Sequence, residues 1–414
     1  MSRDYDIVVV GGGLAGASLA CGLADSGLSI ALVEAVAFDA PADANMAVRT
    51  TAIAWGTRAL FEQLDLWPAM ARDAAPIKRL HVSQKDHFGR VKVDAEDYDL
   101  PALGYVIPNL AMIGALRARL ETLDGVEVIA PARFEALDYG ADDGRVTITI
   151  SRADDNQASI SEQLTARLLI GADGARSSVR EALGIGARVD DYHQRALITV
   201  VRPDRPHEGC AYERFTPDGP IAILPRTRDT CAAVWTLPSA HAQRLCDVDE
   251  GEFVDALQQA FGQRLGALAL DGPRGSYPLA RVLCNRAVSR RAALIGNAGH
   301  SLHPAAAQGF NLAIRDALVF AAMLAERRAD TADHDPGDAD LLAAWAEARR
   351  PDQQRVANFT DAIVRVFSNR VPGLGHARGA GLAALSLLPA VRDDMARRSM
   401  GLAVAPAMAG RGRS

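Results

Sequence analysis

The sequence predicts an α/β fold in which a parallel sheet is combined with a second, antiparallel sheet and a helical C-terminal region. A β-branched run at 7–10 leads through closely spaced glycines into an apolar helical pattern, as expected for a strand, turn and helix. Residues 76–99 and 186–283 instead show several strand-like runs with few intervening helices. A chain of 414 residues is long enough for two or three domains.

The first turn carries a dinucleotide-binding pattern. Gly11, Gly13 and Gly16 stand at G-x-G-x-x-G spacing after the strand at 7–10. The first glycine allows a tight turn, the second lets the backbone approach a pyrophosphate, and the third lets the helix pack on the strand. Glu34 ends the next strand, where a carboxylate can accept a hydrogen bond from a ribose hydroxyl. The pattern favours an adenine-dinucleotide site over a merely tight turn and does not distinguish NAD from FAD.

The composition indicates a globular enzyme and argues against nucleic-acid binding. The chain is 49% hydrophobic and 23% charged, and its formal net charge is -6. Residues 365–414 nevertheless contain eight arginines and two aspartates, so this tail could face an anionic surface. The uncharged stretch 379–391 is too short to span a bilayer, and it predicts either a helix lying on an anionic membrane or an ordinary docked helix.

Neither disulfides nor a metal site are expected. The five cysteines are widely spaced and include no C-x-x-C pair, which fits a reducing, cytoplasmic location. His300 and His303 lie three residues apart, but no further ligand has matching spacing, so packing or pocket roles are favoured. Asp4 and Asp6 precede the first apolar run in place of a basic region, which argues against a secretory signal.

Two later turns repeat the order of strand, small residues and helix. In the turn within 168–180, Asp173 could accept hydrogen bonds from sugar hydroxyls or be a plain turn residue. Ser178 and Glu181 have the spacing of a capping box, which predicts that a helix starts at Ser178. The turn within 292–311 leads into a helix whose small residues permit close approach to a flat ligand.

Other segments are expected to surround these turns. The sheet at 186–283, with a helix near 250–262, would form the lid or floor of a pocket. Residues 329–340 have the composition of a surface linker, and the helical region that follows is expected to be interrupted at Pro351. Arg49, on a loop after the first unit, could pair with a phosphate or a cofactor carbonyl, or be a solvated charge.

The chain is therefore divided into three predicted parts. The nucleotide-binding part is Rossmann-like and discontinuous in sequence, so its three turns must meet in space. The boundaries are 1–75, 100–184 and 284–330 for the nucleotide-binding domain, 76–99 and 185–283 for the antiparallel-sheet substrate domain, and 341–414 for the C-terminal helical region with its basic tail.

Taken together, the three turns resemble those of the single-component FAD-dependent aromatic hydroxylases of the para-hydroxybenzoate hydroxylase type. The resemblance runs in order from residue 4 to about 330 and includes Arg176 and Arg180 after the second turn. Within that family the chain is most similar to the ubiquinone-biosynthesis hydroxylases. The segments that carry this similarity are 213–225, the third turn with Asn297, 367–374 and 396–402.

The resemblance implies a set of FAD-binding residues. Asn297 stands where the broader family has Asp, so the implied ribityl contact is neutral, and Ala307 stands where Gly is usual, so its Cβ could crowd the flavin. The implied contacts are Gly11, Gly13, Gly16 and Glu34 to the ADP half, Asp173 and Gly174 near the pyrophosphate and ribose, Arg49 and Asn109 on the flavin side, Asn297 at the ribityl chain, and Pro304, Gly309 and Asn311 against the isoalloxazine.

The implied activity is hydroxylation of the aromatic ring of a polyprenylated phenol in ubiquinone biosynthesis. NADPH or NADH would reduce FAD, O₂ would form a C4a-hydroperoxyflavin, and the phenol ring would attack it. The resemblance also implies contact with other ubiquinone-biosynthesis proteins, and the basic C-terminal region predicts peripheral contact with the anionic inner face of the plasma membrane. No catalytic side chain is assigned from spacing.

Three alternatives remain at this stage. The same fold could carry a flavin-dependent halogenase or a prenyl reductase, although the four tryptophans stand alone and form no W-x-W-x-I-P motif. The chain could also be a non-catalytic flavin-binding scaffold in a quinone-biosynthesis complex.

Overall fold

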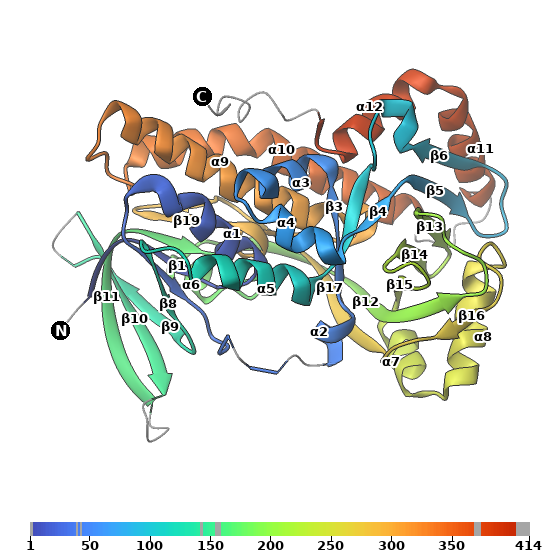
Figure 1. Ribbon diagram of the computed structural model, residues 1–414, viewed down its shortest axis with the longest axis horizontal. Helices are drawn as coiled ribbons and strands as arrows, with labels where there is room; N and C mark the ends of the chain where they lie inside the picture. Colours follow the sequence, from blue (N-terminus) through green and yellow to red (C-terminus); the bar gives the residue numbers. More distant parts are fainter. Residues whose placement is uncertain are drawn as a thin grey trace.

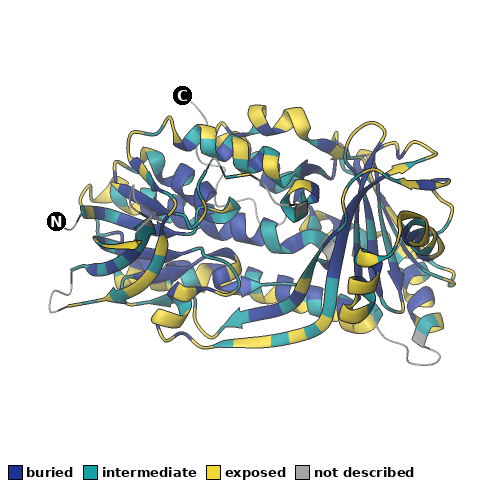
Figure 2. Ribbon diagram, turned by 90° about the horizontal axis from the view of Figure 1, so that it is seen from below, coloured by how far each residue is buried: buried dark blue, intermediate teal, exposed yellow. Residues whose placement is uncertain are grey.

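The computed structural model describes residues 3–38, 40–41, 44–140, 144–153, 159–367 and 374–402. Two large sheets lie toward opposite ends of the molecule, and the long helices α9 (Gln308–Asp330) and α10 (Ala339–Phe367) run along one long side (Figure 1). Buried residues run through the strands and inner helices, whereas exposed residues lie mainly on outer helices and loops (Figure 2). The predicted α/β class is confirmed.

The first sheet has a parallel centre that is buried on both faces. Ile7 and Val9 of β1 belong to one apolar cluster, whereas Val8 and Val10 belong to another, as expected for a central strand covered on both sides. The parallel strands occur in the order β8 (Val126–Ile129), β2 (Ile30–Val33), β1 (Arg3–Val10), β11 (Ser159–Gly171) and β19 (Ala292–Leu294), and β10 (Val146–Ala153), β9 (Arg133–Asp138) and β18 (Val288–Ser289) add antiparallel pairs.

The register of this sheet brings the three predicted turns together. Val10 of β1 is paired with Gly171 of β11, and Gly171 is paired with Leu294 of β19. Because these strands are parallel, the turns that follow them leave the same edge of the sheet.

Helix α1 (Leu14–Leu23) crosses from β1 to β2 and packs closely against α9. A Cβ added at Gly22 would lie 2.7 Å from the Cδ2 atom of Leu318, so glycine permits this approach. The remaining elements of this half are α2 (Ala44–Val48), α3 (Trp55–Gln63), α4 (Trp67–Met70), α5 (Asn109–Leu120), α6 (Ser178–Ala182) and a small sheet in the order β3 (Thr50–Ala54), β7 (Gly104–Pro108) and β4 (Ala75–Ile77).

The second sheet is antiparallel except for the parallel pair β13–β5. One face is covered by α7 (Ser239–Asp247), which the sequence did not predict, and α8 (Glu250–Phe261), through an apolar cluster that includes Trp235 and Phe253. The strand order is β20 (His300–Ser301), β17 (Gly275–Cys284), β12 (Ala187–Pro203), β15 (Cys231–Pro238), β14 (Gly219–Pro225), β13 (Cys210–Thr216), β5 (Arg79–Gln84) and β6 (Arg90–Asp94), with β16 (Leu268–Leu270) paired to β12.

The expected interruption at Pro351 is wrong, because α10 is continuous from Ala339 to Phe367. Proline removes one helical hydrogen bond, but buried polar contacts with α9 hold both flanks. The Trp345 indole donates to the backbone oxygen of Asp316 at 3.1 Å, and Arg349 contacts the Asp316 carboxylate at 2.6 Å. Beyond the proline, Asp352 accepts from Arg315 of α9 at 2.9 Å.

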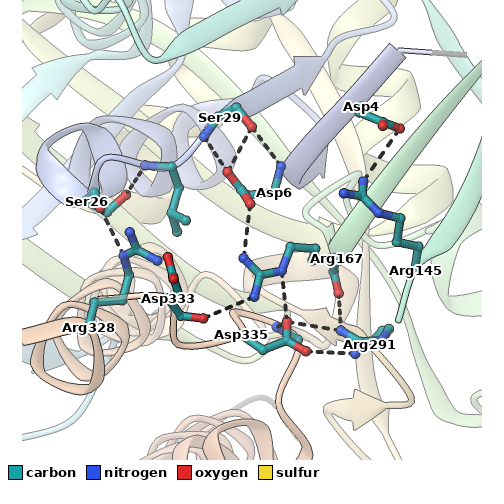
Figure 3. Close-up of polar contacts among 12 residues, drawn as sticks. Asp4, Asp6, Ser26, Ser29, Arg145, Arg167, Arg291, Arg328, Asp333 and Asp335 are labelled. Atoms are coloured by element: carbon teal, nitrogen blue, oxygen red, sulfur yellow. Dashed lines mark hydrogen bonds and ion pairs between the residues drawn. The ribbon is translucent and has the colours of Figure 1, made fainter. Parts of the chain in front are cut away.

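The predicted surface linker at 329–340 is attached to the first sheet by charged contacts (Figure 3). Asp335 accepts from Arg291 at 2.7 Å and lies 3.5 Å from the guanidinium of Arg167. Arg167 also lies 3.3 Å from the carboxylate of Asp6 on β1. These contacts explain why an Asp-rich segment can follow one path between α9 and α10.

The C-terminal helices α11 (Leu374–Leu387) and α12 (Pro389–Ser399) lie beside the β5–β6 hairpin (Figure 1). Leu382 and Ala396 join an apolar cluster with Val91 and Val93 of β6. The basic tail at 403–414 lies outside the described residues. None of the helices in the described ranges combines the length and apolar content required to cross a bilayer.

Candidate FAD and substrate site

The three turns open onto one cavity of about 2140 Å³ that extends to the inner face of the second sheet. Gly16 is the predicted site residue that does not line it. The predicted residues that do line it are Gly11, Gly13, Glu34, Arg49, Asn109, Asp173, Gly174, Asn297, Pro304, Gly309 and Asn311.

The first turn depends on backbone contacts that only glycine allows. Gly11 has φ +107°, and an added Cβ would lie 2.5 Å from the carbonyl oxygen of Ala172 in the second turn. A Cβ at Gly16 would lie 1.9 Å from the carbonyl oxygen of Gly11. Gly13 caps α1 without a side-chain hydrogen bond, and Gly13 and Leu14 border the cavity. The N-terminus of α1 therefore faces the cavity with no side-chain cap, which suits a diphosphate.

Glu34 is placed beside this turn at the end of β2. Its carboxylate accepts from the backbone N–H groups of Gly12 at 2.6 Å and Val36 at 2.9 Å. A carboxylate has more than two acceptor directions, so Glu34 retains capacity for the hydroxyls of a ribose.

The second turn is closed by Asp173. Its carboxylate accepts from the Ser177 hydroxyl at 2.5 Å and from the backbone N–H of Val179 at 3.2 Å. The predicted helix start at Ser178 is confirmed, because α6 begins there, and its N-cap is the preceding Ser177, which accepts from the Arg180 backbone N–H at 2.9 Å. The bond to Asp173 orients the Ser177 hydroxyl for this role.

Arg180 joins the second turn to the third. Its guanidinium donates to the carbonyl oxygen of Ala298 at 2.8 Å and to that of Ala175 at 3.0 Å. The sequence placed Arg180 in the motif but did not predict this bridge, because Ala298 lies 118 residues further along the chain.

The third turn contains one amide side chain that is open to the cavity and one that is hydrogen-bonded within the protein. Asn297 is exposed to the cavity, and no hydrogen bond of its side chain is found within the described part of the chain. Asn311 is buried, and its amide oxygen accepts from the Ala54 backbone at 2.8 Å and the Thr57 hydroxyl at 2.7 Å. Its amide nitrogen donates to Ala52 and Ala307, so Asn311 anchors α9 to β3 as well as bordering the cavity.

Arg49 and Asn109 border the cavity next to the small sheet, because Arg49 directly precedes β3 and Asn109 begins α5 directly after β7. The Arg49 guanidinium lies over the Tyr277 ring, 4.3 Å from its centre. Burial raises the pKa of Tyr277, so its hydroxyl stays protonated at neutral pH. Asn109 accepts from the Thr51 hydroxyl at 2.8 Å. Arg49 is therefore held on an aromatic surface and is not a freely solvated loop charge.

The two histidines of the third turn have separate roles. The Nε2 atom of His300 lies 2.5 Å from the Asp316 carboxylate, whose pKa burial alone would raise but His300 and Arg349 hold below its ordinary value. His303 lines the cavity, and burial lowers its pKa to about 4, so it is neutral. Within the described ranges, no cluster of three or more His, Cys, Asp or Glu side chains is arranged to hold a metal ion.

The end of the cavity farthest along the second sheet is apolar. Its walls come from β5, β6, β13, β14, α10, α11 and α12. The charged side chains of Glu213, Arg378 and Arg392 also line the cavity from these elements. The lining side chains there include Leu80, Val82, Val91, Val93, Ala211, Phe215, Ala222, Leu224, Phe359, Ile363, Leu382 and Leu385.

The residues at the three turns fit FAD. A glycine turn and an uncapped helix end suit the diphosphate, Glu34 suits the ribose, and the exposed Asn297 amide suits a ribityl hydroxyl. Among the residues that the structure describes, no contact marks a separate site for a nicotinamide cofactor.

Known proteins are similar to this chain over most of its length. Residues 4–360 match the family model described as FAD binding domain. The ubiquinone hydroxylase UbiL of Rhodospirillum rubrum is 35% identical over 401 residues, covering 96% of this chain and 89% of that protein. The 3-demethoxyubiquinol 3-hydroxylase of Escherichia coli is 31% identical over 413 residues, covering 97% of this chain and 100% of the relative.

Solved structures share the fold. The p-nitrophenol 4-monooxygenase PnpA from Pseudomonas putida DLL-E4 has a TM-score of 0.76 at 19% identity, with 100% of both chains covered. The anhydrotetracycline hydroxylase OxyS from Streptomyces rimosus has a TM-score of 0.72 at 23% identity, covering 99% of this chain and 78% of that one.

Proposed function

Because the chain belongs to the FAD binding domain family and is a flavin-dependent monooxygenase akin to the ubiquinone hydroxylases, we propose that it hydroxylates the ring of a polyprenylated phenol. Sequence resemblance favours an octaprenyl methoxyphenol, as in 2-octaprenyl-6-methoxyphenol hydroxylase. NADPH or NADH is the proposed reductant.

The observation that carries this proposal is the continuity of the cavity. One end is formed by the three polar turns, and the other by apolar side chains of the second sheet and the C-terminal helices. A long prenyl chain needs such an apolar wall, while its aromatic head must reach the redox cofactor.

When bound, FAD supplies the redox chemistry, taking electrons from the nicotinamide and activating O₂. The protein's own contribution is to bind and orient. Gly11, Gly13 and Glu34 would hold the nucleotide half, Asn297 and Asn109 would contact the flavin half, and the second sheet would cover the substrate ring, since all of these residues and the inner face of that sheet line the cavity. The apolar walls around the substrate ring would limit the access of water to the reaction.

The decisive experiment uses the purified full chain. Bound flavin should be bleached by NADPH or NADH without oxygen, and an octaprenyl methoxyphenol should gain one oxygen atom by mass spectrometry in air. A halogenated or a saturated prenyl product would identify one of the alternative enzymes. Flavin that is never reduced would identify a scaffold.

We also propose that α11 and α12 rest on an anionic membrane surface. Leu387, Leu388 and Val391, at the junction of these helices, are 79%, 54% and 49% exposed. Three arginines of α12, Arg392, Arg397 and Arg398, follow Val391. Asp393 and Asp394 lie between them and pair with Arg392 and Arg398, so the stretch from Arg392 to Arg398 keeps one net positive charge (three Arg less two Asp). Apolar side chains flanked by basic ones are typical of an interfacial segment.

Co-sedimentation with vesicles tests the membrane proposal. Replacing Leu387, Leu388 and Val391 with serine should reduce binding to vesicles containing phosphatidylglycerol. Val36→Ser is the matched control, since Val36 is 52% exposed but lies far along the chain from these helices. Equal binding by both variants would contradict the proposal.

A further inference from the structure

The cavity face of the second sheet contains one carboxylate among apolar residues. Alternate residues of β13, Ala211, Glu213 and Phe215, line the cavity, because successive side chains of a strand point to opposite faces. Glu213 therefore points into the space that the substrate would occupy. It opens the 213–225 segment that carries part of the resemblance to the ubiquinone-biosynthesis hydroxylases.

The register of the sheet defines the neighbours of Glu213. It is paired with Val82 of β5 on one side and Ala222 of β14 on the other. The same row continues on both sides. Val91 of β6 is paired with Val82, and Val234 of β15 is paired with Ala222. All four neighbours in this row are apolar and line the cavity. Ala222 is small and leaves room above the carboxylate.

Within the part of the chain that the structure describes, no hydrogen bond or ion pair to the Glu213 carboxylate is found. Its side chain keeps some accessible surface because it borders the cavity, but it lies deep in the protein. Burial raises its pKa to about 7. An isolated buried carboxylate is destabilising, so its presence calls for a partner that the protein itself does not supply.

We propose that Glu213 is a catalytic residue that accepts the proton of the substrate's phenol hydroxyl. This inference rests on the proposed function. The phenol O–H bond breaks and a carboxyl O–H bond forms, so the negative charge moves from Glu213 to the phenolate, and no oxidant is consumed. The phenolate makes the ring more electron-rich and therefore more reactive toward an electrophilic oxygen.

A carboxylate that titrates near neutrality suits this role. A general base works best when its pKa lies near the working pH, and Glu213 is a stronger base than an exposed glutamate. Other charged or titratable side chains line the same cavity, and no ion pair of any of them with Glu213 is found among the described residues. Those at or near the turns and the first sheet are Glu34, Arg133, Glu135, Asp173, Arg176 and Arg180, and the others are Arg49, Tyr277, His303, Arg378 and Arg392.

The test compares Glu213→Gln with Glu96→Gln, which removes an exposed carboxylate from the turn after β6. Glutamine keeps the size of the side chain but cannot take up the proton. Glu213→Gln should bind FAD and accept electrons from NAD(P)H as the native protein does, while hydroxylation of 2-geranylphenol should fall about 100-fold. Electrons should then leave as hydrogen peroxide. Glu96→Gln should match the native protein.

Binding provides a readout that does not depend on turnover. If the carboxylate form accepts from the phenol, the affinity of the FAD-loaded protein for 2-geranylphenol should rise about tenfold between about pH 6 and pH 8, following the ionised fraction of Glu213. Calorimetry should show this rise for the native protein and Glu96→Gln, and no rise for Glu213→Gln.

The outcomes separate the two proposals. Native protein that forms product, with Glu213→Gln within about twofold of it and equally pH-dependent, overturns the assignment of Glu213 alone. Native protein that reduces its flavin but hydroxylates no prenylphenol overturns the proposed function, and the role of Glu213 falls with it. Loss of both FAD binding and folding in Glu213→Gln would show a structural role and also overturn the assignment.

Discussion

Replacing Gly16 with alanine tests whether the close contact between α1 and the first turn is needed to bind FAD. The added Cβ would lie 1.9 Å from the carbonyl oxygen of Gly11 and 3.2 Å from the Cβ of Ala172. A backbone oxygen cannot be moved by rotating a side chain, so either α1 or the turn must shift. That shift would displace the backbone that is expected to hold the diphosphate.

The expected magnitude follows from two opposing terms. Overpacking a close-packed site costs about 1–3 kcal/mol. Alanine also favours a helix over glycine by about 1 kcal/mol, which offsets part of that cost. We therefore expect the free energy of unfolding to fall by about 0–2 kcal/mol and FAD affinity to fall at least about tenfold.

Gly114→Ala in α5 is the matched control. An added Cβ there meets nothing within 4 Å, so only the helix-propensity gain remains. This variant should be more stable than the native protein by about 0.5–1 kcal/mol and bind FAD equally well. The two glycine-to-alanine changes should thus shift stability in opposite directions.

The assay combines thermal unfolding by circular dichroism with FAD titration of the apoprotein, followed by flavin fluorescence. If Gly16→Ala bound FAD like the native protein and melted at a higher temperature, as Gly114→Ala should, the close contact would not be required. The reasoning about the first turn would then be refuted.

Three further sites are tested by substitution, one of them with a control variant. Ala307→Gly should stabilise the protein by about 0.5–1 kcal/mol, because Ala307 has a left-handed backbone with φ +50° and glycine relieves that strain, as chemical denaturation can measure. Ser177→Ala should destabilise it by about 1 kcal/mol through loss of the α6 cap, whereas Ser178→Ala should change stability by less than about 0.5 kcal/mol. Asp352→Asn should remove, at neutral pH, the stabilisation that the native protein loses only at low pH. Acid unfolding followed by the fluorescence of each protein measures this difference.

The direction of the pH effect at Asp352 follows from the charges that surround this carboxyl group. Burial alone would raise the pKa of this carboxyl, but Arg315 and Arg349 lower it to about 2. The folded pKa lies below the unfolded value of 3.8, so the stabilisation is present above pH 3.8 and is lost as the pH falls toward about 2. If Asp352→Asn and the native protein unfolded alike from neutral pH down to this range, the ion pairs of Asp352 would add nothing to stability.

The other two sites have their own contradicting outcomes. Equal effects of Ser177→Ala and Ser178→Ala on stability would contradict the observed cap of α6. An Ala307→Gly protein less stable than the native one would show that the backbone at Ala307 is not strained.

Local sequence was sufficient to predict those turns and helices whose formation depends on residues close together in the chain. The spacing of Gly11, Gly13 and Gly16 predicts the turn because each glycine answers a backbone constraint within a few residues. The periodicity near 250–262 likewise predicts α8, observed as Glu250–Phe261. Local rules failed at Pro351, where contacts with α9 outweigh the missing hydrogen bond. They correctly predicted that a helix starts at Ser178, although the capping residue is Ser177, whose hydroxyl is oriented by Asp173.

The sequence alone determined the fold class, the family and the residues of the three turns, since these depend on backbone geometry that short motifs encode. Only the tertiary structure decided that the turns leave one edge of the parallel sheet, that Arg180 joins two of them, and that Glu213 stands among apolar neighbours. The physical reason is strand register. Which side chains share a face depends on pairings between strands far apart in the chain, and a shift of one residue would turn Glu213 away from the cavity.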